Sequence, residues 1–149
     1  MALSRRGIIL GCSALPLLGG GALFAYVNGA FRSGERPTMT PPEALEAASR
    51  GEVLFVDIRR PDEWAATGIP EGAVPLDLRR DDFLEALAAV HQNPDQPIAV
   101  ICARGVRSHR MTARLSEAGY TQVIDIPEGM LGSFAGPGWL ERGLPVTMP

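Results

Sequence analysis

The amino-acid sequence predicts a three-layer α/β domain, with a mostly parallel central sheet flanked by helices on both faces. Short continuous apolar runs, typical of strands buried in a parallel sheet, occur at 53–58, 98–101 and 123–126. Segments with helical periodicity alternate with these runs, which favours right-handed crossover connections. Ligands of such sheets bind at the carboxyl ends of the strands, where Asp57 and Cys102 fall. We therefore expect the functional site at that edge.

The first half of the domain contains two predicted strands and two predicted helices. Thr40 and Glu43 have the spacing of a capping box, a proline occupies the first turn, and Gly51 ends this first helix. Pro75 restricts the second strand to the edge of the sheet, because proline cannot join a central ladder. The predicted elements are a helix at 40–49, a strand at 53–58, a short helix from Arg60, a turn-rich connection at 68–73 and an edge strand at 74–76.

The second half contains the strand that leads to Cys102. An amphipathic pattern with Phe83 and Leu87 on its apolar face predicts the helix before that strand. Gly119 marks the end of the helix that follows Cys102. The predicted elements are helices at 81–90 and 107–118, strands at 98–101 and 123–126, a flexible glycine-rich stretch at 129–138 and a last helical turn at 139–142.

The first thirty residues have the layout of an export signal. Arg5 and Arg6 precede a mildly hydrophobic, glycine-rich stretch at 7–27, a pattern that resembles a twin-arginine signal. That stretch has 21 residues, which is long enough for a membrane anchor. We expect the domain to be exported, either periplasmic or anchored at the outer face of the inner membrane, with membrane contact only through this leader. We divide the chain into an export signal or N-terminal membrane anchor at 1–30, a linker at 31–37 and one domain at 38–149.

Composition argues against several classes of function. The chain carries 14 basic and 17 acidic residues, a formal net charge of -3, and no basic stripe, which argues against nucleic-acid binding. Its two cysteines are Cys12 in the leader and Cys102, so the domain holds a lone thiol and no disulfide. The histidines and this cysteine have no metal-ligand spacing, and Asp81, Asp82 and Glu85 indicate a solvated helix start. We expect no metal and no cofactor.

The stretch from Cys102 to Ser108 carries the candidate chemistry. It places a cysteine where a buried strand turns into a helix, whose N-terminus offers free N–H groups and a partial positive charge. Beside two arginines, this thiol is expected to be ionised near neutral pH, and the thiolate is the nucleophile. The backbone N–H groups of this loop can curl into a cradle for sulfur, and Gly105 allows the positive φ or the close approach that the curl needs. The residues predicted to hold a persulfide or an oxyanion are Ala103, Arg104, Gly105, Val106, Arg107 and Ser108.

The spacing within this loop favours sulfur transfer. Cysteine phosphatases and arsenate reductases use a C-x5-R cradle, but Ser108 stands at that position and Arg107 lies one residue nearer to Cys102. A smaller cradle suits a single sulfur atom better than a phosphoryl group. The Cys102 thiolate would attack a sulfane sulfur, keep it as a persulfide and pass it to an acceptor. A phosphatase or arsenate reductase, and a module that senses or carries sulfur without turnover, remain as alternatives.

Three motifs resemble those of the single-domain rhodaneses, a family of sulfurtransferases. The segment 56–64 resembles their D-[VI]-R and E-[WF] entry motif, 102–108 resembles their C-x-x-G-x-R-S loop, and 129–146 resembles their C-terminal ending with G-G, W and G-L-P-V. The resemblance implies a rhodanese-like fold. It also implies a sulfurtransferase similar to thiosulfate:cyanide sulfurtransferase, with thiosulfate or a persulfide as donor and cyanide or a thiol as acceptor.

The resemblance also assigns roles to individual residues. It makes Cys102 the persulfide carrier, and it brings Arg107 and the loop backbone to the sulfur or the substrate anion. It makes Asp57 and Arg59 a supporting pair near the site, although a strand-end ion pair is an equally good interpretation of these two residues. The family's usual histidine is missing from 68–73, and we expect this change to affect only local packing.

Expectations for five other side chains complete the analysis. Glu128 replaces a frequent family glycine, and we expect it to narrow the mouth of the pocket. His109 is expected to face solvent, and His91 to end a helix as a structural residue. Trp64 and Trp139 are expected to pack in the core, with Trp139 the better candidate for lining the pocket.

Overall fold

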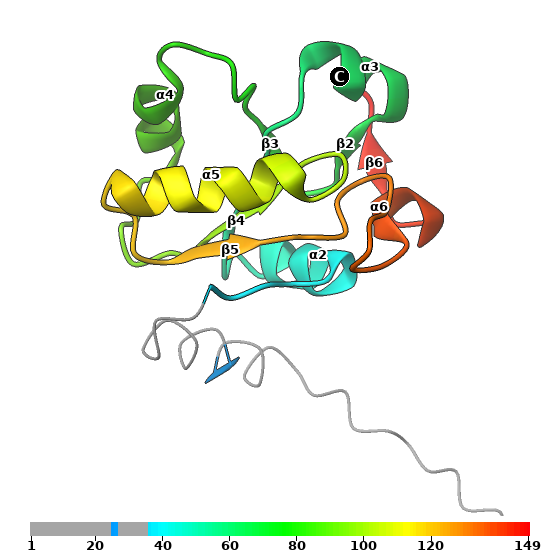
Figure 1. Cartoon of the computed structure of the whole chain (residues 1–149), viewed down its shortest axis with the longest axis horizontal. Coiled ribbons are helices and arrows are strands. Elements are labelled where there is room, and N and C mark those ends of the chain that lie inside the picture. The colour runs from blue at the N-terminus through cyan, green and yellow to red at the C-terminus, as the bar shows by residue number, and fades with distance from the viewer. Residues whose placement is uncertain (1–24, 27–35) are drawn as a thin grey trace, which may run out of the picture.

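The computed structural model describes residues 25–26 and 36–149 (Figure 1). Most of the predicted export signal, including Cys12, and most of the predicted linker lie outside the described residues. Within the described part of the chain, no helix combines the length and the apolar character needed to cross a membrane.

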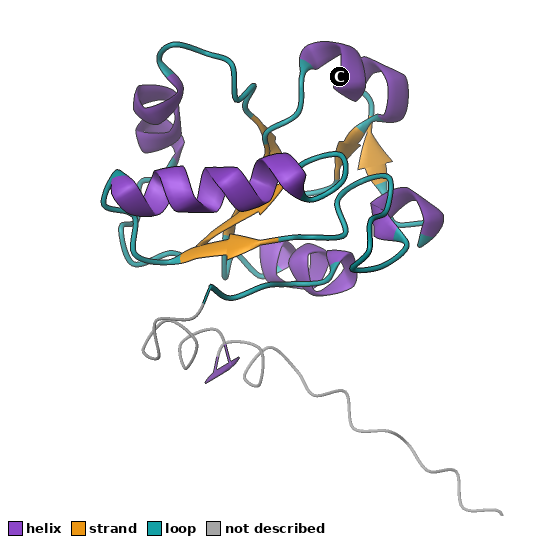
Figure 2. Cartoon of the chain, viewed as in Figure 1, coloured by secondary structure: helices purple, strands orange, loops and turns teal. Residues whose placement is uncertain are grey.

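The domain is built on a parallel sheet, as predicted (Figure 2). Within the described residues this sheet has four strands in the order β3-β1-β4-β5, and all neighbouring pairs run parallel. The strands are β1 (Leu54–Asp57), β3 (Val74–Pro75), β4 (Ile98–Ile101) and β5 (Val123–Asp125). The register pairs Asp57 of β1 with Ile101 of β4, so that Asp57 and Cys102 lie at the same edge of the sheet.

Helices cover both faces of this sheet (Figure 1), which confirms the predicted three layers. The helices are α2 (Pro41–Ser49), α3 (Pro61–Thr67), α4 (Phe83–Val90), α5 (Val106–Glu117) and α6 (Gly138–Glu141). The domain has two hydrophobic cores, one on each face of the sheet, and successive residues of β4 pack alternately into them. Ala99 and Ile101 pack in the core with α2 and α6, whereas Ile98 and Val100 pack in the core with α4 and α5. The short predicted edge strand is β3, whose Pro75 lies at the border of the sheet.

A second, small sheet lies beside α3. β2 (Ile69–Pro70) pairs antiparallel with β6 (Val146–Thr147), which joins the turn-rich connection to the C-terminal segment. We did not predict this pair, because strands of two residues carry no periodic pattern. The N-terminus of α3 is closed by Glu63, whose carboxylate accepts a hydrogen bond from the Arg60 backbone N–H at 3.0 Å.

The helix boundaries follow local capping. At the start of α2 the Glu43 carboxylate accepts hydrogen bonds from the Thr40 backbone N–H and hydroxyl, both at 2.7 Å, which confirms the predicted capping box. α4 begins at Phe83, two residues later than predicted, because Asp82 has a non-helical backbone with φ -93° and ψ 28°. α5 begins at Val106, one residue earlier than predicted.

Candidate active site

The predicted loop lies between β4 and α5, at the carboxyl edge of the sheet. Gly105 precedes α5 with a φ of 81°, in the left-handed region that favours glycine. A Cβ at this position would lie 2.2 Å from the carbonyl oxygen of Pro127, so the loop can pack this closely only with glycine. Val106, the first residue of the helix, is exposed. The turn at Gly105 therefore determines where α5 begins and how it covers Cys102.

Cys102 is buried beneath the first turn of α5, with 1% of its surface exposed. The Ser108 backbone N–H donates a hydrogen bond to Sγ at 3.4 Å, and the Ser108 hydroxyl oxygen lies 3.5 Å from Sγ. In the described part of the chain, the two hydrogen bonds of Sγ both involve Ser108, because its N–H donates to Sγ and the Cys102 thiol donates to its hydroxyl oxygen. The backbone N–H at this position can stabilise negative charge on the sulfur, whereas the Ser108 hydroxyl donates its proton to the Gly105 carbonyl oxygen at 3.0 Å.

The glycine-rich segment after β5 forms backbone hydrogen bonds with the loop that contains Cys102. The Met130 and Leu131 N–H groups donate to the carbonyl oxygens of Cys102 and Ala103, both at 2.9 Å. Gly129, with a φ of 68°, packs so closely that a Cβ there would lie 2.5 Å from the Ala103 carbonyl oxygen. We predicted a flexible stretch here, but its glycines instead allow a close, hydrogen-bonded contact with the cysteine loop.

Arg107 is engaged by Glu63 of α3. Its Nη1 and Nη2 donate to Oε2 and Oε1 of Glu63 at 2.8 and 2.5 Å. Hydrogen bonding from Arg107 lowers the pKa of Glu63 to about 2. Because both of its terminal nitrogens donate to Glu63, Arg107 connects α5 to α3. The predicted contact of Arg107 with sulfur or a substrate anion stays a prediction.

We expect Glu63→Gln to destabilise the domain by about 1–2 kcal/mol at neutral pH. The pKa of Glu63 is depressed in the folded protein from 4.5 to about 2. The ion pair therefore contributes stability that is fully present above pH 4.5 and is lost as the pH falls toward 2. Urea unfolding of the wild type and of Glu63→Gln should show this difference in the free energy of unfolding at neutral pH. The difference should disappear as the pH approaches the pKa of Glu63 in the folded protein.

The matched control for this prediction is Glu46→Gln. It opens an exposed pair with Arg50 on α2, and it should change the free energy of unfolding by less than about 0.5 kcal/mol. A Glu63→Gln effect that is no larger than this control, or that does not decline at acidic pH, contradicts the prediction.

The Asp57–Arg59 pair is fully buried at the same edge of the sheet. Arg59 Nη2 and Nε donate to the Asp57 carboxylate at 2.7 and 3.0 Å. Its remaining donors reach the Thr67 hydroxyl and the Gly68 carbonyl oxygen, both at 2.7 Å. These bonds join the end of β1 to α3 and the start of β2. The geometry favours the strand-end ion pair of our two interpretations, and a role at Cys102 stays a prediction.

Arg104 is the loop arginine that has no carboxylate partner among the described residues. Its Nη1 donates to the Gly132 carbonyl oxygen at 3.3 Å. It lines a groove of about 680 Å³ together with the fully exposed Phe134 and with Glu141. Arg104 is therefore the positive charge that a small anion in this groove would meet first.

Glu128 and Trp139 have packing roles. The Glu128 carboxylate accepts a hydrogen bond from the Gly138 N–H at 2.9 Å and pairs with Arg142 at 2.7 Å, and this pairing lowers the pKa of Glu128. Glu128 thus lies buried at the base of the glycine-rich segment, and our expectation that it narrows a pocket mouth was wrong. Trp139 is fully buried, with its ring centroid 5.6 Å from that of Phe55, which confirms its expected place in the core.

Sequence reasoning missed Asp125, which lies in β5 close to Ser108. Its Oδ1 is buried and has no hydrogen-bond partner among the described residues. Burial raises the pKa of Asp125, and the Ser108 hydroxyl and the His109 ring offset part of this shift. His109 is 63% exposed, as expected, while its Nδ1 lies 3.6 Å from Asp125 Oδ2. An acidic residue inside the apolar run 123–126 was the available signal, and we used that run only to predict a strand.

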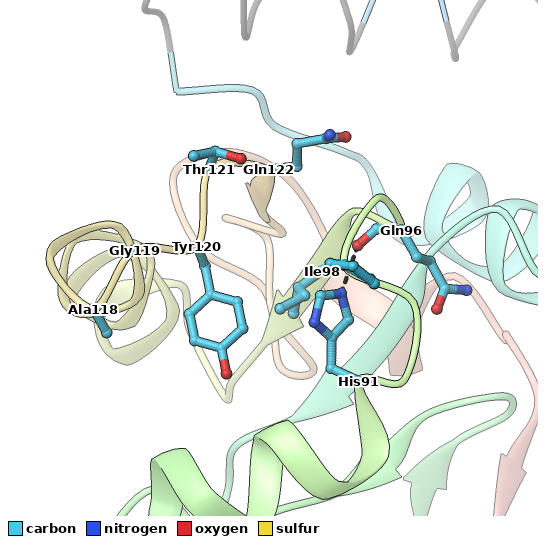
Figure 3. A pocket seen from close by; sticks show the side chains of 9 residues that line it. His91, Gln96, Ile98, Ala118, Gly119, Tyr120, Thr121 and Gln122 are labelled. Atoms are coloured by element: carbon cyan, nitrogen blue, oxygen red, sulfur yellow. Dashed lines mark hydrogen bonds between the residues drawn. The ribbon is translucent and has the colours of Figure 1, made fainter.

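A separate pocket lies beside the amino end of β4 (Figure 3). It has a volume of about 260 Å³, and its lining includes His91, Gln96 and Tyr120. His91 Nε2 lies 2.8 Å from the Gln96 carbonyl oxygen, and the His91 and Tyr120 ring centroids are 5.7 Å apart. These contacts stabilise the turn between α4 and β4, as expected for a structural His91. Cys102 follows the opposite end of the same strand.

The site combines one buried thiol, two polar groups of Ser108 at its sulfur and Arg104 of the same loop. In the part of the chain that the structure describes, no three potential metal ligands gather in one place. This arrangement is typical of α/β domains that transfer a group through a single cysteine.

Comparison with known proteins identifies the family. Residues 40–133 match the model of the Rhodanese-like domain, so the chain belongs to this family. Thiosulfate sulfurtransferase GlpE of Haemophilus influenzae is 35% identical over 108 residues, which cover 72% of this chain and 91% of that protein. A sulfurtransferase of Allochromatium vinosum is 29% identical over 102 residues, which cover 68% and 85% of the two chains.

A solved structure agrees with these relatives. The polysulfide-sulfur transferase homodimer of Wolinella succinogenes superposes with a TM-score of 0.59 and 25% identity, and the match covers 85% of this chain and 87% of that one. The family and these relatives support assigning this chain as a sulfurtransferase. They also confirm the α/β fold that the sequence predicted.

Proposed function

We propose that this sulfurtransferase carries sulfur on Cys102, from thiosulfate or a persulfide donor to cyanide or a thiol. The observation that carries the proposal is the buried Sγ at the head of α5, with the N–H and the hydroxyl of Ser108 at 3.4 and 3.5 Å. The N–H group can stabilise the sulfur as an attacking thiolate and again as a leaving thiolate. The similarity to a thiosulfate sulfurtransferase supports thiosulfate as donor.

The proposed reaction has two displacement steps at sulfur. The Cys102 thiolate attacks the outer sulfur of thiosulfate, the S–S bond of the donor breaks, and sulfite leaves with the bonding electrons. The acceptor then attacks the outer sulfur of the Cys102 persulfide, and Sγ leaves as a thiolate. Cyanide becomes thiocyanate, or a thiolate acceptor becomes a persulfide, and neither step needs an external oxidant or reductant.

Mass spectrometry of the full chain tests this proposal. After treatment with thiosulfate, we expect one additional sulfur atom on the peptide that contains Cys102. Cyanide should remove this sulfur and release thiocyanate. Thiocyanate release without sulfur on that peptide would contradict the proposal. A persulfide that neither cyanide nor thiols remove would favour a sensing or carrier module, and aryl phosphate hydrolysis without sulfur loading would favour a phosphatase.

Arg104→Ala is expected to weaken the use of thiosulfate. Removing the guanidinium of Arg104, which has no carboxylate partner among the described residues, should raise KM for thiosulfate by about tenfold, because a charge-assisted contact contributes on the order of 1.5 kcal/mol. The turnover number should change less, and the KM difference should shrink at high salt. Arg50→Ala on α2 is the control, and it should leave KM unchanged. An unchanged KM in Arg104→Ala would show that the donor binds elsewhere.

We also propose that the domain works outside the cytoplasm. The support is the twin arginine at Arg5 and Arg6 ahead of the apolar stretch at 7–27. Cell fractionation combined with N-terminal sequencing of the protein is expected to find it in the periplasm or on the outer face of the inner membrane. Recovery of the uncleaved chain from the cytoplasm alone would contradict export.

A further inference from the structure

Three exposed apolar side chains lie around the groove that Arg104 lines. Phe134 is fully exposed, and Val106 and Leu131 are 59% and 43% exposed. The other large apolar side chains that are exposed in the described part of the chain do not line this groove. Soluble domains seldom gather exposed apolar side chains around one concave surface unless that surface binds a ligand. The groove is therefore a candidate binding site for a ligand with an apolar group.

The turn that carries Phe134 is ordered by its own hydrogen bonds. Ser133 and Gly136 exchange backbone hydrogen bonds at 2.9 and 3.3 Å, and the Ser133 hydroxyl donates to the Pro127 carbonyl oxygen at 2.7 Å. The Ala135 N–H donates to the same hydroxyl oxygen at 3.1 Å. Phe134 belongs to neither hydrophobic core, so its ring has no packing role within the described residues. The ring is available for contact with a ligand, and its burial there would favour binding.

The groove borders the loop that contains Cys102. Arg104 is two residues after Cys102, and the Leu131 N–H donates to the Ala103 carbonyl oxygen at 2.9 Å. Val106 is the first residue of α5, whose first turn covers Sγ. The guanidinium of Arg104 is the positive charge expected to bind the donor anion, and Leu131 and Val106 line the same groove. A donor held at Arg104 can therefore extend an organic group into the groove.

We propose that this groove binds the organic group of an anionic sulfur donor, with Phe134 as the residue that determines donor specificity. The donor class that fits is an aryl thiosulfonate, in which the central sulfur atom carries the outer sulfur, two oxygen atoms and an aromatic ring. Arg104 binds the oxygen atoms, as it binds those of thiosulfate in the proposed function, and the ring packs against Phe134 and Leu131. This inference rests on the proposed function, in which Cys102 receives sulfur from such an anion.

Sulfur transfer from this donor balances in the same way as transfer from thiosulfate. The Cys102 thiolate attacks the outer sulfur, the S–S bond of the donor breaks, and an aryl sulfinate leaves with the bonding electrons. The product is the same Cys102 persulfide, and the step needs no external oxidant or reductant.

Glu141 limits the charge that the organic group can carry. It is exposed on α6 and lines the groove together with Arg104. Its carboxylate repels a second negative charge on the ligand, so the anionic group of the donor belongs at Arg104 and the ring is uncharged. Benzenethiosulfonate meets both conditions and is the donor to be tested.

Phe134→Ser is expected to weaken the preference for an aromatic donor. Benzenethiosulfonate and methanethiosulfonate carry the same charge and differ in the size of the organic group. Thiocyanate formation by the full chain gives kcat/KM for each donor. We expect the ratio of kcat/KM for benzenethiosulfonate to that for methanethiosulfonate to be about fivefold lower in Phe134→Ser than in the wild type, because a ring contact is lost. The intrinsic reactivity of each donor cancels when the two proteins are compared. An unchanged or raised ratio overturns the proposal.

Two variants serve as controls for this measurement. Val90→Ser removes an apolar side chain that is 40% exposed at the end of α4, at the opposite end of the sheet from the cysteine loop, and it should leave the ratio unchanged. Arg104→Ala should raise KM for both donors by a similar factor, because both carry the anionic group that this guanidinium binds. A ratio that falls equally in Val90→Ser also overturns the proposal, because the groove would then not determine it.

Binding without reaction separates this inference from the proposed function. Benzenesulfonate lacks the outer sulfur and cannot load Cys102. Titrated into the isotope-labelled full chain, it should shift the amide NMR signals of Leu131 and Phe134, with a Kd about fivefold higher in Phe134→Ser. Shifts confined to other regions, or equal Kd values, overturn the inference while sulfur loading from thiosulfate remains intact. Failure of every donor to load Cys102 overturns the proposed function and the donor role of the groove, whereas the titration still shows whether the groove binds the ring.

Discussion

Cys102→Ser is expected to abolish sulfur loading and to lower thiosulfate:cyanide sulfur transfer by about a thousandfold or more. A serine hydroxyl in place of the thiol cannot form a persulfide, and it is not ionised at neutral pH. The substitution is nearly isosteric at a site that is 1% exposed, so the fold should persist. Initial rates of thiocyanate formation, together with the mass of the peptide that contains residue 102, measure both effects.

Cys12→Ser is the matched control for this experiment, because it makes the same chemical change at the other cysteine of the chain. It should load one sulfur atom and turn over like the wild type. Sulfur that still loads on the Cys102→Ser variant, or activity that disappears in Cys12→Ser, would rule out Cys102 as the carrier.

The position of this cysteine could be predicted because it depends on local sequence. Continuous apolar runs indicated buried parallel strands, and the helical pattern after Cys102 indicated a strand-to-helix turn. Gly105 was predicted to allow the curl of the loop, and it has a φ of 81° in the structure. The parallel register of β1 and β4 then places Asp57 and Cys102 at one edge, as such a sheet requires.

The partner of Arg107 could not be predicted in the same way. Glu63 lies 44 residues away in the sequence, and it was noted only as part of the entry motif. Whether a loop arginine is free or paired depends on how closely α3 packs against the start of α5, which no periodic pattern encodes. The pairing leaves Arg104 as the loop arginine without a carboxylate partner among the described residues, and therefore shifts the expected anion contact to Arg104.

Asp125 was missed for a related reason. Its neighbours in space, Ser108 and His109, come from the preceding helix, and their proximity follows from the contact between β5 and α5. The sequence predicted both elements but contained no information on which side chains meet between them. The pairing of Glu128 with Arg142 could not be predicted for the same reason, because it depends on where α6 packs in the folded domain.

Arg59→Met is expected to destabilise the domain by about 3–5 kcal/mol, because it leaves the Asp57 carboxylate buried without its partner. Arg59 donates to this carboxylate through Nε and Nη2, and both residues are fully buried. The double variant Asp57→Asn/Arg59→Met removes both charges and should lose less stability than Arg59→Met alone. Urea unfolding at neutral pH measures all three proteins.

The same variants separate support of the fold from participation in sulfur transfer. Arg59 binds Asp57, Thr67 and Gly68, and these contacts connect β1 to α3 and β2. A purely structural pair predicts that Arg59→Met, studied in the temperature range where it is folded, keeps its turnover number and its KM for thiosulfate within about twofold of the wild type. Arg104→Ala should instead raise KM with unchanged stability. A stable Arg59→Met protein with little activity would indicate that the Asp57–Arg59 pair takes part in sulfur transfer, because lost stability could not then explain the lost turnover.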